Sequence, residues 1–308
     1  MLISTDLHGH TLFSDGRATP VEYVNFRRSL GHKVIAVADH DHFAGVRSAW
    51  VAAEQAGMLL VPASEITSFW GFGGGDAEQV HVLAYFPWDY VASGRLEHTF
   101  LHRRGQRVQA KWKSFVLEWI HALDVDDRLR MDPEGELEKL GADAFPALQP
   151  FIDRIVVRHR DLFEPFRKHH VRFWEDDAEL FGWEPEEAIE AIRGDGGIDI
   201  VAHPGRYRDK ARLDRLIALA SGLEVVTSRH HATVAEHFRD VATRQRKLWT
   251  ASADDHQNAR YVMPLHGSPV ATVERLLGRT IPMSMIVTPS WQQVAATPEL
   301  GDPGFQVR

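Results

Sequence analysis

The chain has no cysteine, no long hydrophobic run and no excess of basic residues, and each absence excludes a class of protein. Cys 0 excludes disulfides, thiolate metal ligands and thiol redox chemistry. No uninterrupted apolar run approaches the ~18 residues of a transmembrane helix, and the first residues lack a secretory-signal pattern, so we expect a cytoplasmic protein without a membrane partner. A formal net charge of -8 disfavours long duplex nucleic acid as a partner.

The rest of the composition is that of an ordinary globular protein. With 308 residues, 44% hydrophobic and 25% charged, the chain can form one large domain with an insertion. Short apolar runs alternate with helical patterns, which is typical of βα units around a parallel sheet. The runs predicted as strands are residues 2–7, 33–38, 58–62, 80–85, 198–202, 222–227 and 247–252. We therefore expect an α/β fold.

The clearest helix signal lies between the first two predicted strands. Thr19 suits an N-cap, Pro20 suits the first turn, and Glu22 completes a capping box. Gly31 is placed to end the helix.

Residues 93–183 break the alternation of strands and helices. They carry long helical patterns and no strand of comparable quality, which predicts a helical insertion. The main domain is then discontinuous, formed by residues 1–92 and 184–287. Residues 288–308 are rich in Pro, Gly and Gln, and we expect them to form an irregular C-terminal tail.

Histidines and carboxylates recur where the predicted strands end. In a parallel βα barrel these ends meet at one rim, where active sites lie. Nitrogen and oxygen ligands without sulfur suit Mn, Fe or Zn. The candidates at the rim are His8, His10, His40, Glu65, His81, His203, His230, Asp254 and His256.

Four of these positions also have ordinary explanations. His8-Gly9-His10 places two imidazoles on one face of an extended segment, but such a pair alone is weak evidence for a metal. Glu65 could be a surface carboxylate, and His81 a buried histidine with a neutral partner. The following Ser14-Asp15-Gly16 shifts the balance toward a metal site.

Taken together, these segments resemble the polymerase-and-histidinol-phosphatase (PHP) family of metal-dependent phosphoesterases. The resemblance covers residues 1–92 and 185–260 and implies a distorted, TIM-like, seven-stranded (β/α)7 barrel. It rests on Asp6-Leu7-His8-Gly9-His10, Ser14-Asp15-Gly16, Ala38-Asp39-His40-Asp41, Ser64-Glu65-Ile66, Val80-His81, Ala202-His203-Pro204-Gly205 and Asp254-x-His256.

The resemblance also implies two or three divalent ions, Mn, Fe or Zn, in a trinuclear arrangement. Glu65 would bridge two of the ions. The implied ligands are His8, His10, Glu65 and Asp254 for the first ion, Glu65, His81 and His203 for the second, and Asp15, His40 and His256 for the third.

The implied activity is hydrolysis of a phosphate monoester by hydroxide that the ions generate near neutral pH. We expect Arg206 and His230 to hold the phosphate oxygens, with Arg17 a weaker candidate that could simply be solvated. Either His230 or metal-bound water could protonate the leaving group. The run Thr227-Ser228-Arg229-His230-His231 departs from the Tyr-Ser-x-His-Ser form common in the family.

The expected substrate is a small phosphorylated metabolite, best matched by a nucleotide: a nucleoside bisphosphate or a short oligonucleotide end. Histidinol phosphate is an alternative substrate. A non-catalytic PHP module is an alternative of another class, and it predicts missing ligands. Trp112, Trp119 and Trp174 could engage a partner protein, although the seven-residue spacing of the first two is typical of a helix core. The sequence leaves the oligomeric state open.

Overall fold

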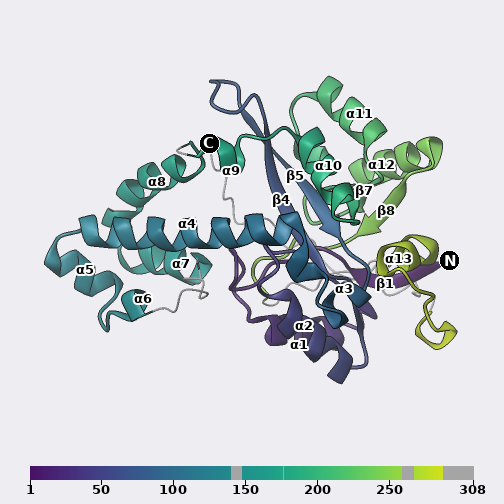
Figure 1. Ribbon diagram of the computed structural model, residues 1–308, viewed down its shortest axis with the longest axis horizontal. Coiled ribbons are helices and arrows are strands. Elements are labelled where there is room, and N and C mark those ends of the chain that lie inside the picture. Colours follow the sequence, from purple (N-terminus) through teal and green to yellow (C-terminus); the bar gives the residue numbers. More distant parts are fainter. Residues whose placement is uncertain (140–147, 176, 259–266, 287–308) are drawn as a thin grey trace.

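Two β-sheets and the helices around them form the part of the chain that carries the candidate residues (Figure 1). The computed structural model describes residues 1–139, 148–175, 177–258 and 267–286. The strands are β1 (Leu2–Asp6), β2 (Val34–Ile35), β3 (Leu59–Leu60), β4 (Ala63–Trp70), β5 (Glu78–Tyr85), β6 (Ile198–Val201), β7 (Gly222–Val226), β8 (Leu248–Ala251) and β9 (Gly267–Pro269). The patterns in the sequence predict all of these except β4 and β9.

The strand orders are β3-β2-β1-β9 in one sheet and β4-β5-β6-β7-β8 in the other. At one seam β3 leads directly into β4, and the Glu65 amide donates to the Asp39 carbonyl at 3.2 Å. At the other seam the segments after β1 and β8 pair, because the Asp254 amide donates to the His8 carbonyl at 2.8 Å. The predicted α/β class is confirmed, and the closed seven-stranded barrel stays a prediction.

The expectation of a purely parallel sheet is wrong for β5 and β9. Strand β5 is antiparallel to both β4 and β6, and β9 is antiparallel to β1. The turn of residues 71–77 joins β4 to β5, with Gly71 and Gly73 at positive φ. A connection this short permits only an antiparallel pair, since a parallel crossover needs about a dozen residues or more. His81 therefore lies within a reversed strand, opposite Thr67, and not at a strand end.

Within the described residues, seven α-helices pack around the strands. In the first of them Thr19 and Glu22 form the predicted capping box, with Pro20 in the first turn. The helices are α1 (Pro20–Ser29), α2 (Val46–Gln55), α3 (Asp89–Ala92), α10 (Pro185–Gly194), α11 (Lys210–Leu219), α12 (Ala232–Gln245) and α13 (Val270–Leu277). Helices α1 and α2 lie on the opposite side of the strands from α11 and α12 (Figure 1).

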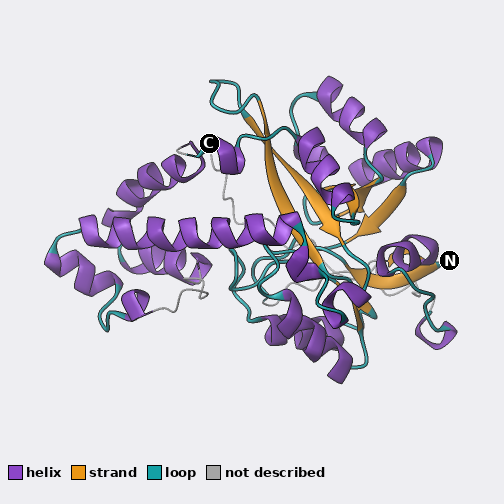
Figure 2. Cartoon of the chain, viewed as in Figure 1, coloured by secondary structure: helices purple, strands orange, loops and turns teal. Residues whose placement is uncertain are grey.

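The described part of residues 93–183 is helical and extends to one side of the strands (Figure 2). Its α-helices are α4 (Phe100–Ala122), α5 (Val125–Met131), α6 (Glu136–Lys139), α7 (Leu148–Arg158), α8 (Arg160–Glu175) and α9 (Ala178–Phe181). They share an aromatic core in which Trp112 stacks on Phe173 with ring centroids 4.1 Å apart. Trp112 and Trp119 are buried there, as the helix spacing predicts, and Trp174 packs against the same core.

Among the described helices, including the 23-residue α4, none is both long and apolar enough to cross a bilayer. The predicted tail, residues 288–308, lies outside the described residues.

A buried ion network joins α1 to β1 and to the segment that follows β8. Arg27, fully buried in α1, donates from Nε to Asp6 at 2.8 Å and from Nη2 to Asp255 at 2.6 Å. Its Nη1 donates to Asn258 at 2.8 Å. Arg27 therefore neutralises two carboxylates that water does not reach.

Replacing Arg27 with Met should lower the free energy of unfolding by about 3–5 kcal/mol, because two buried carboxylates lose their partner. Urea unfolding followed by circular dichroism measures this. The control is Arg47→Met, which breaks an exposed pair with Glu97 at 3.8 Å and should change stability by less than about 1 kcal/mol. Equal losses in the two variants would contradict the role assigned to Arg27.

Candidate metal centre

Glu65, buried near the start of β4, is the carboxylate on which the site converges. Both of its oxygens face imidazole nitrogens. The contacts are Oε1 with His81 Nδ1 at 2.8 Å and His203 Nε2 at 3.0 Å, and Oε2 with His8 Nε2 at 3.1 Å, His10 Nε2 at 3.3 Å and His40 Nδ1 at 3.4 Å. Five predicted ligands, all histidines, thus contact a sixth predicted ligand, Glu65.

Asp254 follows β8 and closes the site from the opposite seam. Its Oδ1 lies 3.3 Å from His10 Nε2 and 3.7 Å from His8 Nε2. The same oxygen is 3.7 Å from His256 Nδ1. Asp254 therefore connects His8 and His10, which follow β1, to His256.

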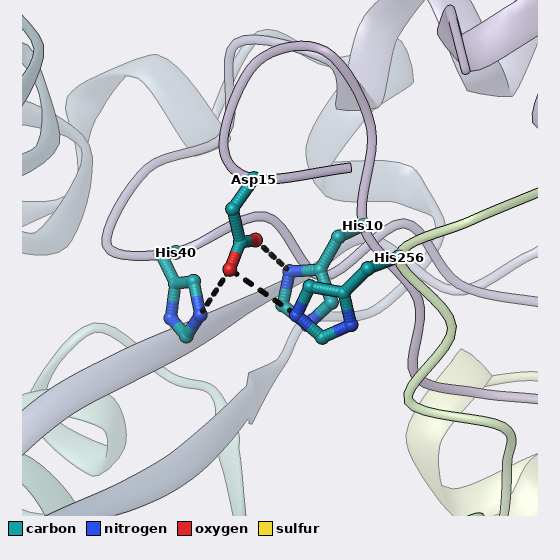
Figure 3. Close-up of side chains that lie close together, drawn as sticks. All are labelled: His10, Asp15, His40 and His256. Carbon is teal, nitrogen blue, oxygen red and sulfur yellow. Dashed lines mark ion pairs between the residues drawn. The ribbon is translucent and has the colours of Figure 1, made fainter. Parts of the chain in front are cut away.

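Asp15 forms a second centre nearer the surface (Figure 3). Its Oδ1 lies 3.5 Å from His10 Nδ1, and its Oδ2 lies 3.2 Å from His256 Nε2 and 3.7 Å from His40 Nε2. Figure 3 shows the three rings turned toward this one carboxylate.

Three groups of side chains place their ligand atoms within 4.8 Å of one another. They are His8, His10, Glu65 and Asp254; His40, Glu65 and His81; and His10, Asp15, His40 and His256. The structure therefore brings together all nine residues predicted as ligands, with His203 joined through Glu65. That they bind metal stays a prediction.

The donor atoms fit a cation chemically. Buried nitrogens of His8, His10, His40 and His81 have no hydrogen-bond partner among the described residues. Buried polar atoms without partners are costly, so their clustering around carboxylates indicates a missing positive ligand. Imidazole and carboxylate donors without thiolates suit Mn, Fe or Zn.

The local charges hold the carboxylates ionised. Burial alone would raise the pKa of Glu65, but His81, His8 and His40 hold it well below its usual range. Burial lowers the pKa of His40 to about 4. For His10 the carboxylates of Asp15, Asp254 and Glu65 outweigh burial and raise the pKa to about 10. The buried carboxylates are thus balanced by positive charge, which protonated His8 and His10 or bound cations can supply.

Glu224, in the middle of β7, orients two of the histidines. Its Oε1 lies 3.1 Å from His8 Nδ1, and its Oε2 accepts from the His203 amide at 2.7 Å. Ser252 also donates to Glu224. Glu224 was not among the predicted site residues. A glutamate inside an apolar strand does indicate a functional site, since a buried charge requires partners. A carboxylate behind a ligating histidine fixes the ring's orientation.

Asp39 holds the loop that carries Asp15. It accepts from the Thr11 amide and hydroxyl at 2.7 Å each and from the Ser14 hydroxyl at 2.6 Å. A Cβ at Gly16 would lie 2.3 Å from the His10 carbonyl oxygen, so only glycine fits there.

Two of the candidate ligands have backbones in the left-handed region. His203 has φ 27° and Asp254 has φ 52°. Non-glycine residues adopt such angles at a cost of about 1–3 kcal/mol, and they cluster at functional sites. Contacts to Glu224 and to His8 fix the two backbones, as described above.

The residues predicted to hold phosphate lie in three different situations. Arg206 is exposed at the end of a short 3-10 helix, η2 (Pro204–Arg206), and no hydrogen bond or ion pair of its guanidinium occurs within the described residues. His230 is occupied at both nitrogens, since Gly205 N donates to Nε2 at 2.9 Å and Nδ1 faces the Val225 carbonyl at 2.9 Å. The ring therefore supports the η2 turn, and its contact with phosphate stays a prediction.

Arg17 is paired and not simply solvated. Its Nε and Nη2 each donate to Asp153 in α7 at 2.7 Å, and Nη1 donates to Gln257. By contrast Arg229, which the sequence analysis did not single out, lies at the site. Its Nε contacts Asp254 Oδ2 at 2.8 Å, and about half of its side chain is exposed.

The chain matches no protein-family model. It is 25% identical over 312 residues to a 3′,5′-nucleoside bisphosphate phosphatase of Chromobacterium violaceum, which covers 96% of this chain and 98% of that protein. It is also 25% identical over 275 residues to the 5′-3′ exoribonuclease Rnm of Salmonella typhimurium, covering 83% of this chain and 86% of that one.

A solved structure described as a metal-dependent phosphoesterase from Bifidobacterium adolescentis has the same fold. The TM-score is 0.59 at 27% identity, over 91% of this chain and 97% of that one. The chain is thus similar along most of its length to hydrolases of phosphoric ester bonds, which confirms the prediction that it is an enzyme of this class.

Proposed function

We propose that the chain is a PHP-type phosphoesterase that uses two or three divalent ions to hydrolyse a phosphate monoester of a small nucleotide. The observation that carries the proposal is the buried nest of imidazole nitrogens around Glu65, several of which have no hydrogen-bond partner among the described residues. The complete set of nine candidate ligands is not what an eroded, non-catalytic module predicts.

The proposal includes the seven-stranded barrel. Strands β3 and β4 form one interrupted strand, so β1, β2, β3 with β4, β5, β6, β7 and β8 make seven. Pairing of the segments after β1 and β8 supports closure.

When bound, the divalent ions supply a hydroxide nucleophile near neutral pH and neutralise the phosphoryl oxygens. Glu65 would bridge two ions, with His8, His10 and Asp254 on one and His81 and His203 on the other. Glu224 fixes the ring of His8 and the backbone of His203.

Arg206 is the side chain best placed to bind the phosphate. It is exposed, and its guanidinium is unpaired among the described residues. Burial lowers the pKa of His81 most, and Glu65 opposes it. The charges of His203 and then Arg206 add smaller lowering effects on this pKa, so Arg206 lies within electrostatic reach of the site. A guanidinium can donate two parallel hydrogen bonds to a phosphate. His230 supports the turn that presents Arg206 through its contact with Gly205.

The similarity to a 3′,5′-nucleoside bisphosphate phosphatase, which spans nearly the whole of both chains, supports a small nucleotide as the substrate. The similarity to a 5′-3′ exoribonuclease keeps a short RNA end as a second candidate.

The proposal is tested by phosphate release from three substrates side by side: 3′,5′-bisphosphorylated adenosine, histidinol phosphate and a short 5′-phosphorylated RNA. Protein stripped of metal is assayed alone and with Mn, Fe or Zn, and Glu65→Gln is the inactive control. We expect metal-dependent release, fastest from the nucleoside bisphosphate. Release from none of the three with any metal, or equal activity of the control, would overturn the proposal.

Arg206→Ala should lower kcat/KM for the phosphate ester by about 10- to 150-fold, the value of a hydrogen bond between charged groups. Its metal content should stay that of the wild type. The matched control is Arg208→Ala, because Arg208 is two residues away, exposed and bound to Glu78. Parallel loss of activity and of metal would make Arg206 structural.

Glu224→Gln should weaken metal binding by about 10- to 100-fold, because it removes the carboxylate behind His8 without changing the side chain's size. Competition with a chelator measures the affinity, and thermal unfolding of the metal-free protein checks the fold. Glu236→Gln, on the exposed face of α12, serves as the comparison. An unchanged affinity in Glu224→Gln would refute the orienting role.

A further inference from the structure

The helical insertion contacts the same loops that carry the outermost candidate ligands. We propose that the insertion is a positioning element for the third cation site, acting through two ion pairs, Arg104–Asp41 and Asp153–Arg17. We call Asp15, His40 and His256 the outer cluster. The inference rests on the proposed function, since it assumes that this cluster binds a cation.

The outer cluster is less well enclosed than the rest of the site. The side chains of Asp15, His40 and His256 are 28%, 20% and 19% exposed. Those of Glu65 and Asp254 are 1% and 3% exposed. Packing in the sheet core therefore holds the inner ligands, whereas the outer ones lie on loops and need another support.

The first support is a buried ion pair next to His40. Arg104 in α4 donates from Nη1 to Asp41 Oδ1 at 2.7 Å, and both side chains are buried. The same Asp41 oxygen accepts from the Thr67 amide at 2.9 Å. Asp41 has φ 62°, so these contacts hold a strained backbone directly after His40.

Helix α4 approaches this loop as closely as the backbone permits. A Cβ at Gly105 would lie 2.7 Å from His42 Cβ and 2.8 Å from the Asp41 carbonyl oxygen. Arg104 also donates to the Leu180 carbonyl at 2.8 Å and lies over the Trp183 ring at 4.2 Å. The contact is thus fixed from the side of the insertion as well.

The second support joins the other two ligands of the cluster. Asp153 in α7 accepts from Arg17 through both carboxylate oxygens at 2.7 Å. Arg17 in turn donates its amide to the His256 carbonyl at 2.9 Å and its side chain to Gln257. Arg17 is two residues after Asp15, so one aspartate of the insertion fixes the spacing between the Asp15 loop and the His256 segment.

The two pairs together contact the segments of all three outer ligands. Among the described residues they make no contact with the segments that carry His8 or His203, and they reach β4, which carries Glu65, through the Thr67 amide. Weakening the insertion's hold should therefore release one cation of three and leave the inner two in place. Loss of overall stability would instead affect all three ions alike.

The test is the Mn²⁺ stoichiometry of the full chain, by equilibrium dialysis with elemental analysis and by the electron paramagnetic resonance of the bound ions. Asp153→Ala is compared with Asp161→Ala, a matched aspartate of the insertion. Asp161 accepts hydrogen bonds from Nη1 and Nη2 of Arg130 at 3.1 and 3.0 Å, and this pair lies within the insertion. Asp153→Glu, which keeps both acceptor oxygens, is the rescue variant.

We expect the wild type, Asp161→Ala and Asp153→Glu to bind three Mn²⁺ ions. In Asp153→Ala the third ion should bind at least about tenfold more weakly, with the first two unchanged and the same melting temperature for the metal-free protein. Three ions of unchanged affinity in Asp153→Ala, or a parallel loss of all three, would overturn the inference. A wild type that binds two ions would overturn it alone, while a wild type that binds none would overturn the proposed function.

Discussion

The rest of the structure depends on one constraint: the carboxylate of Glu65 is buried where water does not reach it. Glu65 is buried among five imidazoles, and its negative charge cannot be compensated by solvent. Asp254 and Glu224 are buried close to the same rings. Positive charge must come from protons on the histidines or from bound cations, and the unpartnered nitrogens favour cations.

The inner and outer parts of the centre are stabilised in different ways. The inner candidate ligands lie on strands or shortly after them, where the sheet fixes the backbone. Glu224 fixes the His8 ring and the His203 backbone. The outer ligands lie on loops held by Asp39, Arg17 and Arg104. Packing in the sheets thus fixes the positions of the inner side chains. Hydrogen bonds to Asp39 and ion pairs with the helical insertion fix the positions of the outer ones.

Local patterns in the sequence predicted much of this. The capping box of α1 and the placement of His8 and Asp254 shortly after strands follow from short-range signals. The alternation of apolar runs does not predict the reversal of β5, because it carries no information on strand direction. It does not predict β4 either, because a charged residue such as Glu65 after an apolar run is typical of a strand end, whereas here the strand continues to Trp70.

Long-range contacts were beyond the reach of the sequence. Nothing near Arg17 indicates a partner in α7, 136 residues away. His230 lies shortly after β7, as predicted. Its contacts with the Gly205 amide and the Val225 carbonyl depend on how β7 and η2 fold against each other.

The pairing of the first and last strands has a consequence for biosynthesis. Arg27 binds an aspartate 228 residues further along, and Thr5 donates to a carbonyl 246 residues away. His8 and His10 are synthesised long before Asp254 and His256, so the nascent chain cannot assemble the complete set of nine side chains until residue 256 of the 308 has emerged. If the proposed ions bind here, metal binding is coupled to the folding of both segments, and a chain that ends before Asp254 would lack part of the ligand set.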